Sequence, residues 1–336
     1  MTVEGALPVL WAGILAFAVV MYVVMDGFDL GIGIMFRFAP DDGARDTMMN
    51  AIAPVWDGNE TWLVLGGSVL FAAFPLAYAV LLPAFYLPLV VMLIALVFRG
   101  VAFEFRARAT GGRRWWDRAF HLGSLVAAFA QGIVLGSFIL GVRVENGAFA
   151  GTAFDWLTPF ALFCGAALVA GYALLGCTWL IMKTAGDAQR WVRRMAPPLL
   201  FAVLAAIVIV SVWTPMIRPA ISGRWFSWPN IVLLSPVPIM TALIAFGLLR
   251  ALRRGREIQP FILAVLLFLL SYLGLGISLF PWIAPPGLSI WDAAAAPGTQ
   301  RFLLWGVGLV LPVVLAYTAY SYRVFRGKAS AGNGYH

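Results

Sequence analysis

The sequence predicts an all-α integral membrane protein. Of its 336 residues, 62% are hydrophobic and only 11% are charged, a balance that soluble globular domains do not show. The hydrophobic residues are gathered into runs of roughly 20, the length at which a helix crosses a bilayer. The basic residues fall mainly in short segments between these runs, so the net charge of +8 indicates membrane topology and no nucleic-acid partner. We therefore expect one multi-pass membrane domain over residues 1–336.

The chain contains about nine apolar segments that are long enough to span a membrane. In order, they cover residues 7–36, 53–74, 78–98, 119–141, 157–182, 198–217, 231–249, 260–281 and 302–322. The first segment exceeds the bilayer thickness, so we expect it to tilt or to bend near residues 27–33. The motifs Gly27-x-x-x-Gly31 and Gly132-x-x-x-Gly136 should let neighbouring helices approach closely.

The distribution of Lys and Arg predicts the orientation of the helices. Nineteen of the 23 basic residues lie in alternate segments, at 37–45, 99–118, 183–194, 250–256 and 323–328. The other four are Arg143, Arg218, Arg224 and Arg301. Because basic residues concentrate on the cytoplasmic side, this bias predicts an outer N-terminus, an inner C-terminus and an odd number of spans.

Four acidic residues lie within the first two apolar segments. They are Asp26, Asp29, Asp57 and Glu60. A charged side chain in a bilayer costs at least ~2.5–3.5 kcal/mol, so it usually has a partner or a function. Each pair is spaced i, i+3 and therefore shares one helix face. In the predicted orientation all four fall in one layer near the inner ends of consecutive helices.

Two interpretations of this acidic layer are open. The carboxyl groups could admit protons from the cytoplasm, since chains of carboxylates are common proton relays within membranes. Asp57 is the best candidate for that role. Alternatively, the acids could pair with Arg37, Arg99 or Arg106 and stabilise helix ends. Arg99 ends the third segment in the same layer, and Glu104 follows just beyond it.

The histidines do not suggest a redox centre in this chain. A membrane haem site needs axial ligands, typically His or Met. Only two histidines are present, His121 at the start of the fourth segment and His336 at the end of a polar tail, 327–336. We interpret His121 as an interfacial side chain with satisfied hydrogen bonds. No metal-ligating cluster is recognisable in the sequence, so we predict no metal or cofactor site in this chain.

Several motifs resemble subunit II of bacterial cytochrome bd-type quinol oxidases. Residues 25–33 (MDGFDLGIG), 53–62 (APVWDGNETW) and 98–106 (FRGVAFEFR) carry the resemblance. Residues 280–283 (FPWI) and 289–293 (SIWDA) fit it too. The resemblance runs the length of the chain with the segment order intact. Membership of the cyanide-insensitive branch of the family is left open by these residues.

The resemblance implies a heterodimeric oxidase of the aerobic respiratory chain in the bacterial cytoplasmic membrane. The partner, subunit I, would hold haems b and d and the quinol site and reduce dioxygen to water. This chain would be haem-free, would stabilise subunit I and would contribute a cytoplasmic proton path. A small single-helix accessory subunit and membrane lipids are further partners that the family allows.

The resemblance also implies an arrangement of helices and roles for individual residues. The fold would comprise two four-helix bundles, 1–141 and 157–281, and a peripheral ninth helix, 302–322. The pair Trp56-Asp57 matches residues that the family associates with a proton path into the oxygen site. Asp57 is then the first proton-path candidate and Asp29 the second, followed by Asp26 and Glu60. The candidates for structural contacts or ion pairs are Trp56, Arg99, Glu104 and Asp292.

The sequence departs from the family pattern at one loop, and it leaves one alternative function open. The predicted outer loop, residues 218–230, is short beside longer members of the family, which leaves open any lipid or structural quinone bound there. A proton-coupled secondary transporter would also carry intramembrane acids. The acids of this chain cluster near one membrane face, however, and transporter sites lie at the midplane.

Overall fold

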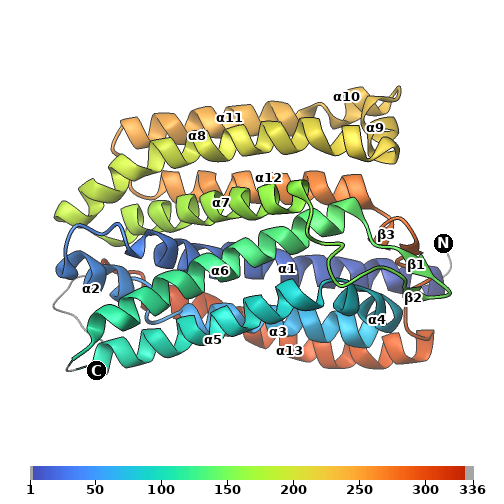
Figure 1. The fold of residues 1–336 in the computed structure, drawn as a ribbon, viewed down its shortest axis with the longest axis horizontal. Helices are drawn as coiled ribbons and strands as arrows, with labels where there is room; N and C mark the ends of the chain where they lie inside the picture. Colours follow the sequence, from blue (N-terminus) through green and yellow to red (C-terminus); the bar gives the residue numbers. More distant parts are fainter. Residues whose placement is uncertain (1–2, 110, 330–336) are drawn as a thin grey trace.

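The computed structural model describes residues 3–109 and 111–329. Long helices run side by side along the molecule (Figure 1). In the first half these are α1 (Val3–Phe36), α2 (Asp42–Asn50), α3 (Trp56–Ala73), α4 (Pro75–Ala84), α5 (Tyr86–Arg108) and α6 (Arg113–Leu140). In the second half they are α7 (Pro159–Lys183), α8 (Gly186–Ile217), α9 (Pro219–Phe226), α10 (Asn230–Leu234), α11 (Pro236–Arg253), α12 (Gln259–Leu279) and α13 (Pro297–Val324). The all-α membrane fold is thus confirmed.

Two short hairpins close the end of the molecule that carries the N-terminus. One pairs β1 (Val144–Glu145) with β2 (Ala148–Phe149), and the other pairs β3 (Trp282–Ala284) with β4 (Leu288–Ser289), both antiparallel. The predicted loop at 218–230 is folded into α9 and the start of α10. In the structure α5 and α6 occupy most of the 99–118 region, and β3, β4 and the start of α13 occupy much of the 282–301 region.

Eight helices in the described ranges are long and apolar enough to cross a membrane. They are α1, α5, α6, α7, α8, α12, α13 and the combined α10–α11 segment. The predicted segment 53–74 corresponds to α3, which is only 18 residues long and begins with polar side chains, among them Asp57 and Glu60. The predicted segment 78–98 is broken at Phe85 into α4 and α5. The number nine therefore stays a prediction.

The two halves of the chain share one core. The largest cluster of buried apolar side chains joins residues of α1, α6 and α7 with residues of α8, α11 and α12. Gly31 on α1 lies so close to α7 that a Cβ at this position would be 1.8 Å from the carbonyl oxygen of Tyr172. Gly132 and Gly136 on α6 meet the backbone of α7 in the same way. Both Gly-x-x-x-Gly motifs thus mark close helix contacts, and the division into two bundles and a ninth helix stays a prediction.

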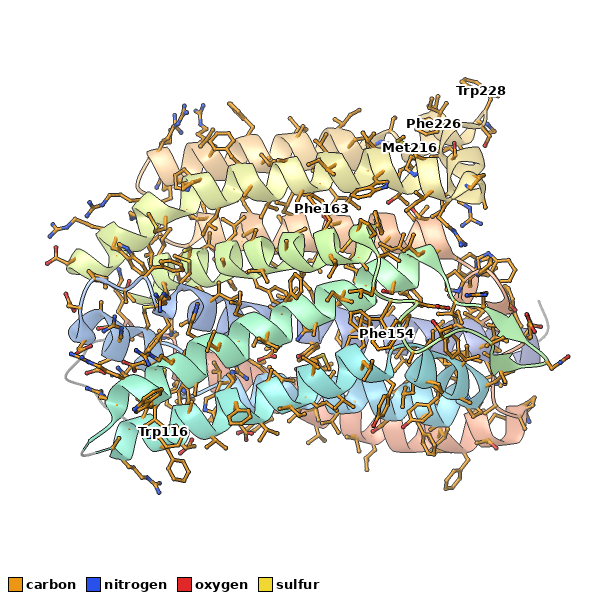
Figure 2. The ribbon with its side chains drawn as sticks, in the orientation of Figure 1. Trp116, Phe154, Phe163, Met216, Phe226 and Trp228 are labelled. Atoms are coloured by element: carbon orange, nitrogen blue, oxygen red, sulfur yellow. The ribbon has the colours of Figure 1, made fainter. Side chains whose placement is uncertain are left out.

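The five basic segments lie at one end of the helices, the end that carries α2 and the C-terminus in Figure 1. Aromatic side chains mark both ends: Figure 2 places Trp116 near the basic end and Phe226 and Trp228 at the opposite end. The side chain of Trp228 is 81% exposed. Both features are typical of helices that span a bilayer with tryptophans at its interfaces.

The orientation itself is a prediction that fusion reporters can test. A reporter fused after Lys328 should report the cytoplasm, and one inserted in the 143–155 loop should report the outside, because the basic end should stay cytoplasmic. The measurement is paired alkaline phosphatase and fluorescent-protein activity in cells. The opposite pattern would place the acidic layer at the outer face and remove the case for cytoplasmic proton entry.

Candidate functional site

A buried arginine on α5 gathers three carboxyl groups from two other helices. Arg99 is completely buried, as are Asp26 and Asp29 on α1. Its Nη2 atom lies 3.0 Å from Oδ1 of Asp26 and 3.8 Å from Oδ2 of Asp29. Its Nη1 atom donates to Oε1 of Glu60 on α3. We call these four residues the acid–arginine cluster.

The helical periodicity of the sequence builds this cluster. Asp26 and Asp29 are one turn apart, so both point from α1 toward the same neighbours. Glu60 lies in the second turn of α3, which packs against α1. Arg99 begins the polar end of α5, and its guanidinium lies 5.5 Å from the ring centroid of Trp56. That separation permits a cation–π interaction, so Trp56 covers one side of the cluster.

An asparagine that the sequence analysis did not single out connects the cluster to the last helix. Asn59 is buried on α3, and its Nδ2 donates to Oδ2 of Asp29 at 2.7 Å. The hydroxyl of Tyr322 on α13 donates to Oδ1 of Asn59 at 2.8 Å. A signal for Asn59 existed, because it is an uncharged polar residue between Asp57 and Glu60 in an apolar segment. Tyr322 carried no such signal, since interfacial tyrosines are common in membrane helices.

A second line of polar groups continues from the cluster toward the middle of the helices. Tyr22 lies one helical turn before Asp26 on α1. Its hydroxyl accepts a hydrogen bond from Nε2 of Gln131 on α6 at 2.8 Å. The Oε1 atom of Gln131 accepts from the hydroxyl of Tyr172 on α7, also at 2.8 Å. Tyr22, Gln131 and Tyr172 therefore form a hydrogen-bonded line between α1, α6 and α7 beside the cluster.

The cluster has more acids than bases and incomplete hydrogen bonding. Three carboxyl groups surround one guanidinium, so full ionisation would leave an excess of negative charge in a buried place. Within the described ranges, neither carboxyl oxygen of Asp26 and neither Nε nor Nη2 of Arg99 has a hydrogen-bond partner of good geometry. Buried polar groups normally do have such partners, and exceptions are often functional.

A separate ion-pair network ties α2, α5 and α6 together at the same end. Arg106, two turns beyond Arg99, donates from Nη1 to Asp46 at 2.7 Å and from Nε to Asp117 at 2.5 Å. Arg113 also donates to Asp46, at 2.5 Å. The sequence analysis missed Asp46 and Asp117 because both lie in polar segments between predicted spans. The charge of Arg106 is thus balanced by Asp46 and Asp117. Of the three arginines proposed as partners of the acidic layer, Arg37, Arg99 and Arg106, only Arg99 pairs with it.

The structure does not place every predicted residue in the cluster. Asp57 is exposed, and no described residue forms a hydrogen bond or ion pair with it. The first turn of α3 directs this side chain to the surface of the subunit, and a proton role for Asp57 stays a prediction. Glu104 and Arg37 are also exposed and lie outside the cluster. Asp292 sits at the opposite end of the molecule, where it accepts from the hydroxyl and amide of Ser289.

The described residues do not suggest a site for a metal or haem. The Nδ1 atom of His121 lies 3.1 Å from the carbonyl oxygen of Gly33, as expected for an interfacial histidine. Within residues 3–109 and 111–329, no group of three or more His, Cys, Asp or Glu side chains could hold a metal ion. His336 lies outside the described residues. That this chain holds no haem stays a prediction from its sequence, which contains only two histidines.

Comparisons with known proteins agree along the whole chain. The sequence model of the family described as cytochrome bd terminal oxidase subunit II matches residues 7–325. The cytochrome bd-I ubiquinol oxidase subunit 2 of Escherichia coli (strain K12) is 28% identical, over 93% of this chain and 92% of that protein. The cytochrome bd ubiquinol oxidase subunit 2 of Bacillus subtilis (strain 168) is 28% identical, over 96% of each.

A solved structure has the same fold. A chain in the structure of bd oxidase from Geobacillus thermodenitrificans superposes with a TM-score of 0.77, over 95% of this chain and 98% of that chain. The sequence identity is 17%, so this likeness bears on the fold.

Proposed function

This chain belongs to the cytochrome bd terminal oxidase subunit II family, and from that premise we propose that it carries protons from the cytoplasm to the oxygen-reducing partner subunit. It is a subunit of a membrane-bound quinol oxidase that reduces oxygen, a multi-pass protein of the bacterial inner membrane. The acid–arginine cluster is the observation that carries the proposal. The oxidase reaction consumes protons, and this cluster is a buried group of titratable side chains near the predicted cytoplasmic end.

The proposed path uses the acids in a defined order. Asp26 and Asp29 hold a proton beside Arg99, where the surplus of carboxyl groups favours proton uptake. Glu60 is half-buried and connects them to the surface of α3. Asp57 lies one turn earlier on α3, where its exposed carboxyl group would face the partner subunit. Arg99 keeps the charge of the cluster low enough for it to stay buried.

The partner subunit supplies the redox chemistry in this proposal. Haems b and d and the quinol are held by subunit I, and this chain stabilises that subunit through its exposed apolar helices. We assign no redox step to this chain, because its sequence contains only two histidines, His121 and His336. A single-helix accessory subunit would be a further partner.

A haem spectrum tests this division of labour. The co-purified complex should show a reduced-minus-oxidised haem spectrum and quinol-dependent oxygen consumption. This subunit expressed alone should bind no haem, because its sequence suggests no pair of axial ligands. Stoichiometric haem in the isolated chain, lost on His121→Ala, would overturn the haem-free assignment. A haem-free complex that moves protons with a solute would instead indicate a secondary transporter.

A further inference from the structure

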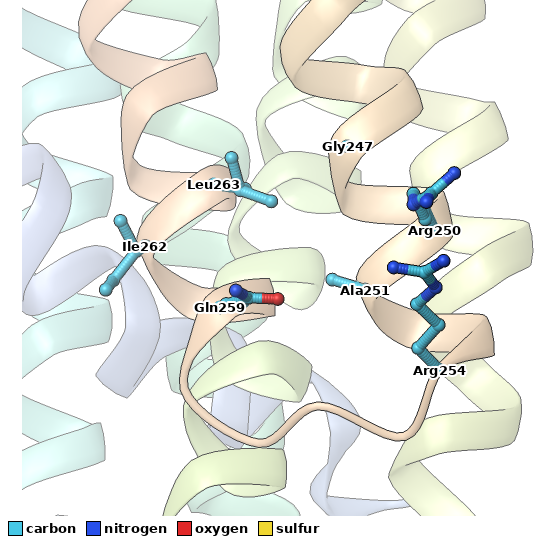
Figure 3. A pocket seen from close by; sticks show the side chains of 7 residues that line it. All are labelled: Gly247, Arg250, Ala251, Arg254, Gln259, Ile262 and Leu263. Carbon is cyan, nitrogen blue, oxygen red and sulfur yellow. The ribbon is translucent and has the colours of Figure 1, made fainter.

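A cavity opens between α11 and α12 at the basic end of the molecule. Its volume is about 360 Å³, and Figure 3 shows the side chains that line it. Arg250 contributes from the last turn of α11 and Arg254 from the residue that follows this helix. Gln259, Ile262 and Leu263 contribute from the first turns of α12. In Figure 1, α11 lies in the layer farthest from α3 and α5, so this cavity is separate from the acid–arginine cluster.

The two arginines give the cavity a net positive charge. They are one helical turn apart and therefore point to the same side of α11. Within residues 3–109 and 111–329, neither guanidinium forms an ion pair or a hydrogen bond. The nearby acid, Glu257, is already engaged by Nζ of Lys328 at 2.8 Å and by Gln189 at 3.0 Å. These hydrogen bonds, first that of Lys328, lower the pKa of Glu257 and keep it ionised in that pairing.

The backbone adds to the attraction for an anion. Helix α12 is 21 residues long and begins at Gln259, on the wall of the cavity. Its N-cap residue, Ile258, makes no side-chain cap, so backbone N–H groups of the first turn remain without a side-chain acceptor. The N-terminus of a helix carries a partial positive charge and favours anions. The turn before it is held in place by Arg193, which donates to the carbonyl oxygens of Gly255 and Arg256 at 2.9 and 3.1 Å.

The other walls of the cavity are apolar. Ile262 is 51% exposed, and Leu263 points from α12 toward Gly247 on α11. A Cβ at Gly247 would be in ordinary van der Waals contact with Leu263, 3.5 Å from its Cδ1 atom, so the two helices lie close together at this wall of the cavity. Apolar side chains continue along the exposed surface of α12 beyond the cavity, at Leu266, Leu269 and Leu273. A ligand with a charged head and a hydrocarbon tail fits this arrangement.

We propose that this cavity binds the phosphate head of an anionic glycerophospholipid, with Arg250, Arg254 and the start of α12 at the phosphate. One acyl chain would lie along the exposed apolar side chains of α12, from Ile262 to Leu273. Basic pockets between membrane helices are suited to such headgroups. A zwitterionic choline headgroup would bring a cation toward the two arginines, so an anionic lipid should be preferred. A free phosphate would satisfy the charge but would leave these apolar side chains uncovered.

Native mass spectrometry of the purified two-subunit complex tests this proposal. The complex is titrated with phosphatidylglycerol, with phosphatidylcholine and with inorganic phosphate. The double variant Arg250→Gln/Arg254→Gln should bind phosphatidylglycerol about tenfold more weakly than the wild type. The variant Arg253→Gln/Arg256→Gln is the matched control, because it removes the same charge from exposed residues outside the cavity and should bind normally.

A second variant and two competitors complete the test. Gly247→Leu should weaken lipid binding with both arginines intact, because Gly247 lines the cavity and a leucine side chain there would fill part of it. Phosphatidylcholine should bind more weakly than phosphatidylglycerol, and millimolar phosphate should not displace the lipid. The proposal fails if both double variants lose binding equally, if the two lipids bind alike, or if phosphate displaces the lipid, which would indicate a free-anion site.

Discussion

Replacing Arg99 with glutamine should prevent most of the complex from assembling. The change leaves Asp26 and Asp29 completely buried without their cation, and Glu60 without its donor. Removing one partner of a buried ion pair typically costs roughly 3–5 kcal/mol, a large part of the stability of a domain. The measurement is the yield of two-subunit complex and its haem content per milligram of membrane protein.

Two further variants distinguish the loss of charge from other effects. Arg108→Gln removes an exposed arginine of the same helix and should leave assembly unchanged. Adding Asp26→Asn to Arg99→Gln removes one of the buried carboxylates that have lost their cation. The yield of two-subunit complex should therefore partly recover. A normal yield of the single Arg99→Gln variant would mean that the buried carboxyl groups are neutral and do not need the guanidinium.

Asp57→Asn should slow oxygen reduction on the order of a hundredfold while leaving assembly intact. Asparagine keeps the shape and hydrogen-bonding capacity of the side chain but cannot titrate. Asp57 is exposed and makes no ion pair with the described residues, so its replacement leaves no buried cation without a partner. The measurement is quinol-dependent oxygen consumption per haem, together with the haem yield.

The matched control is Asp57→Glu, which restores a carboxyl group and should retain much of the turnover. Glu104→Gln offers a second comparison, because Glu104 is also exposed and lies outside the proposed path. Low haem yield with normal turnover per haem in Asp57→Asn would assign a structural role to this residue. Full turnover and full yield would exclude an essential proton role at Asp57.

Helical periodicity was enough to predict the main features of the cluster. Asp26 and Asp29 share one face of α1, and Arg99 was one of three basic partners that the acidic layer could use. The structure selects Arg99, because Arg106 is occupied by Asp46 and Asp117. The sequence could not make that selection, since Asp46 lies on a short helix, α2, and reaches Arg106 only through the tertiary structure.

The position of Asp57 shows where periodicity fails. Asp57 and Glu60 share one side of α3, yet Glu60 turns inward to Arg99 and Asp57 is exposed. A spacing of i, i+3 places two side chains near each other on a helix. It does not predict whether each side chain will be buried inside the subunit or exposed on its surface. The hydrogen bond between Tyr322 and Asn59 could not be predicted either, because nothing in the sequence indicates that α13 packs beside α3.

The most direct test of the proton role is proton uptake during a single reaction with oxygen. The fully reduced complex is mixed with oxygen in weakly buffered solution that contains a pH-indicator dye, and haem oxidation is followed in the same sample. The wild type should take up protons as fast as its oxygen-reduction intermediates decay. Asp57→Asn, compared at equal haem content, should take up protons and complete oxygen reduction more slowly by the same factor. Proton uptake at the wild-type rate in this variant would contradict the proposed path.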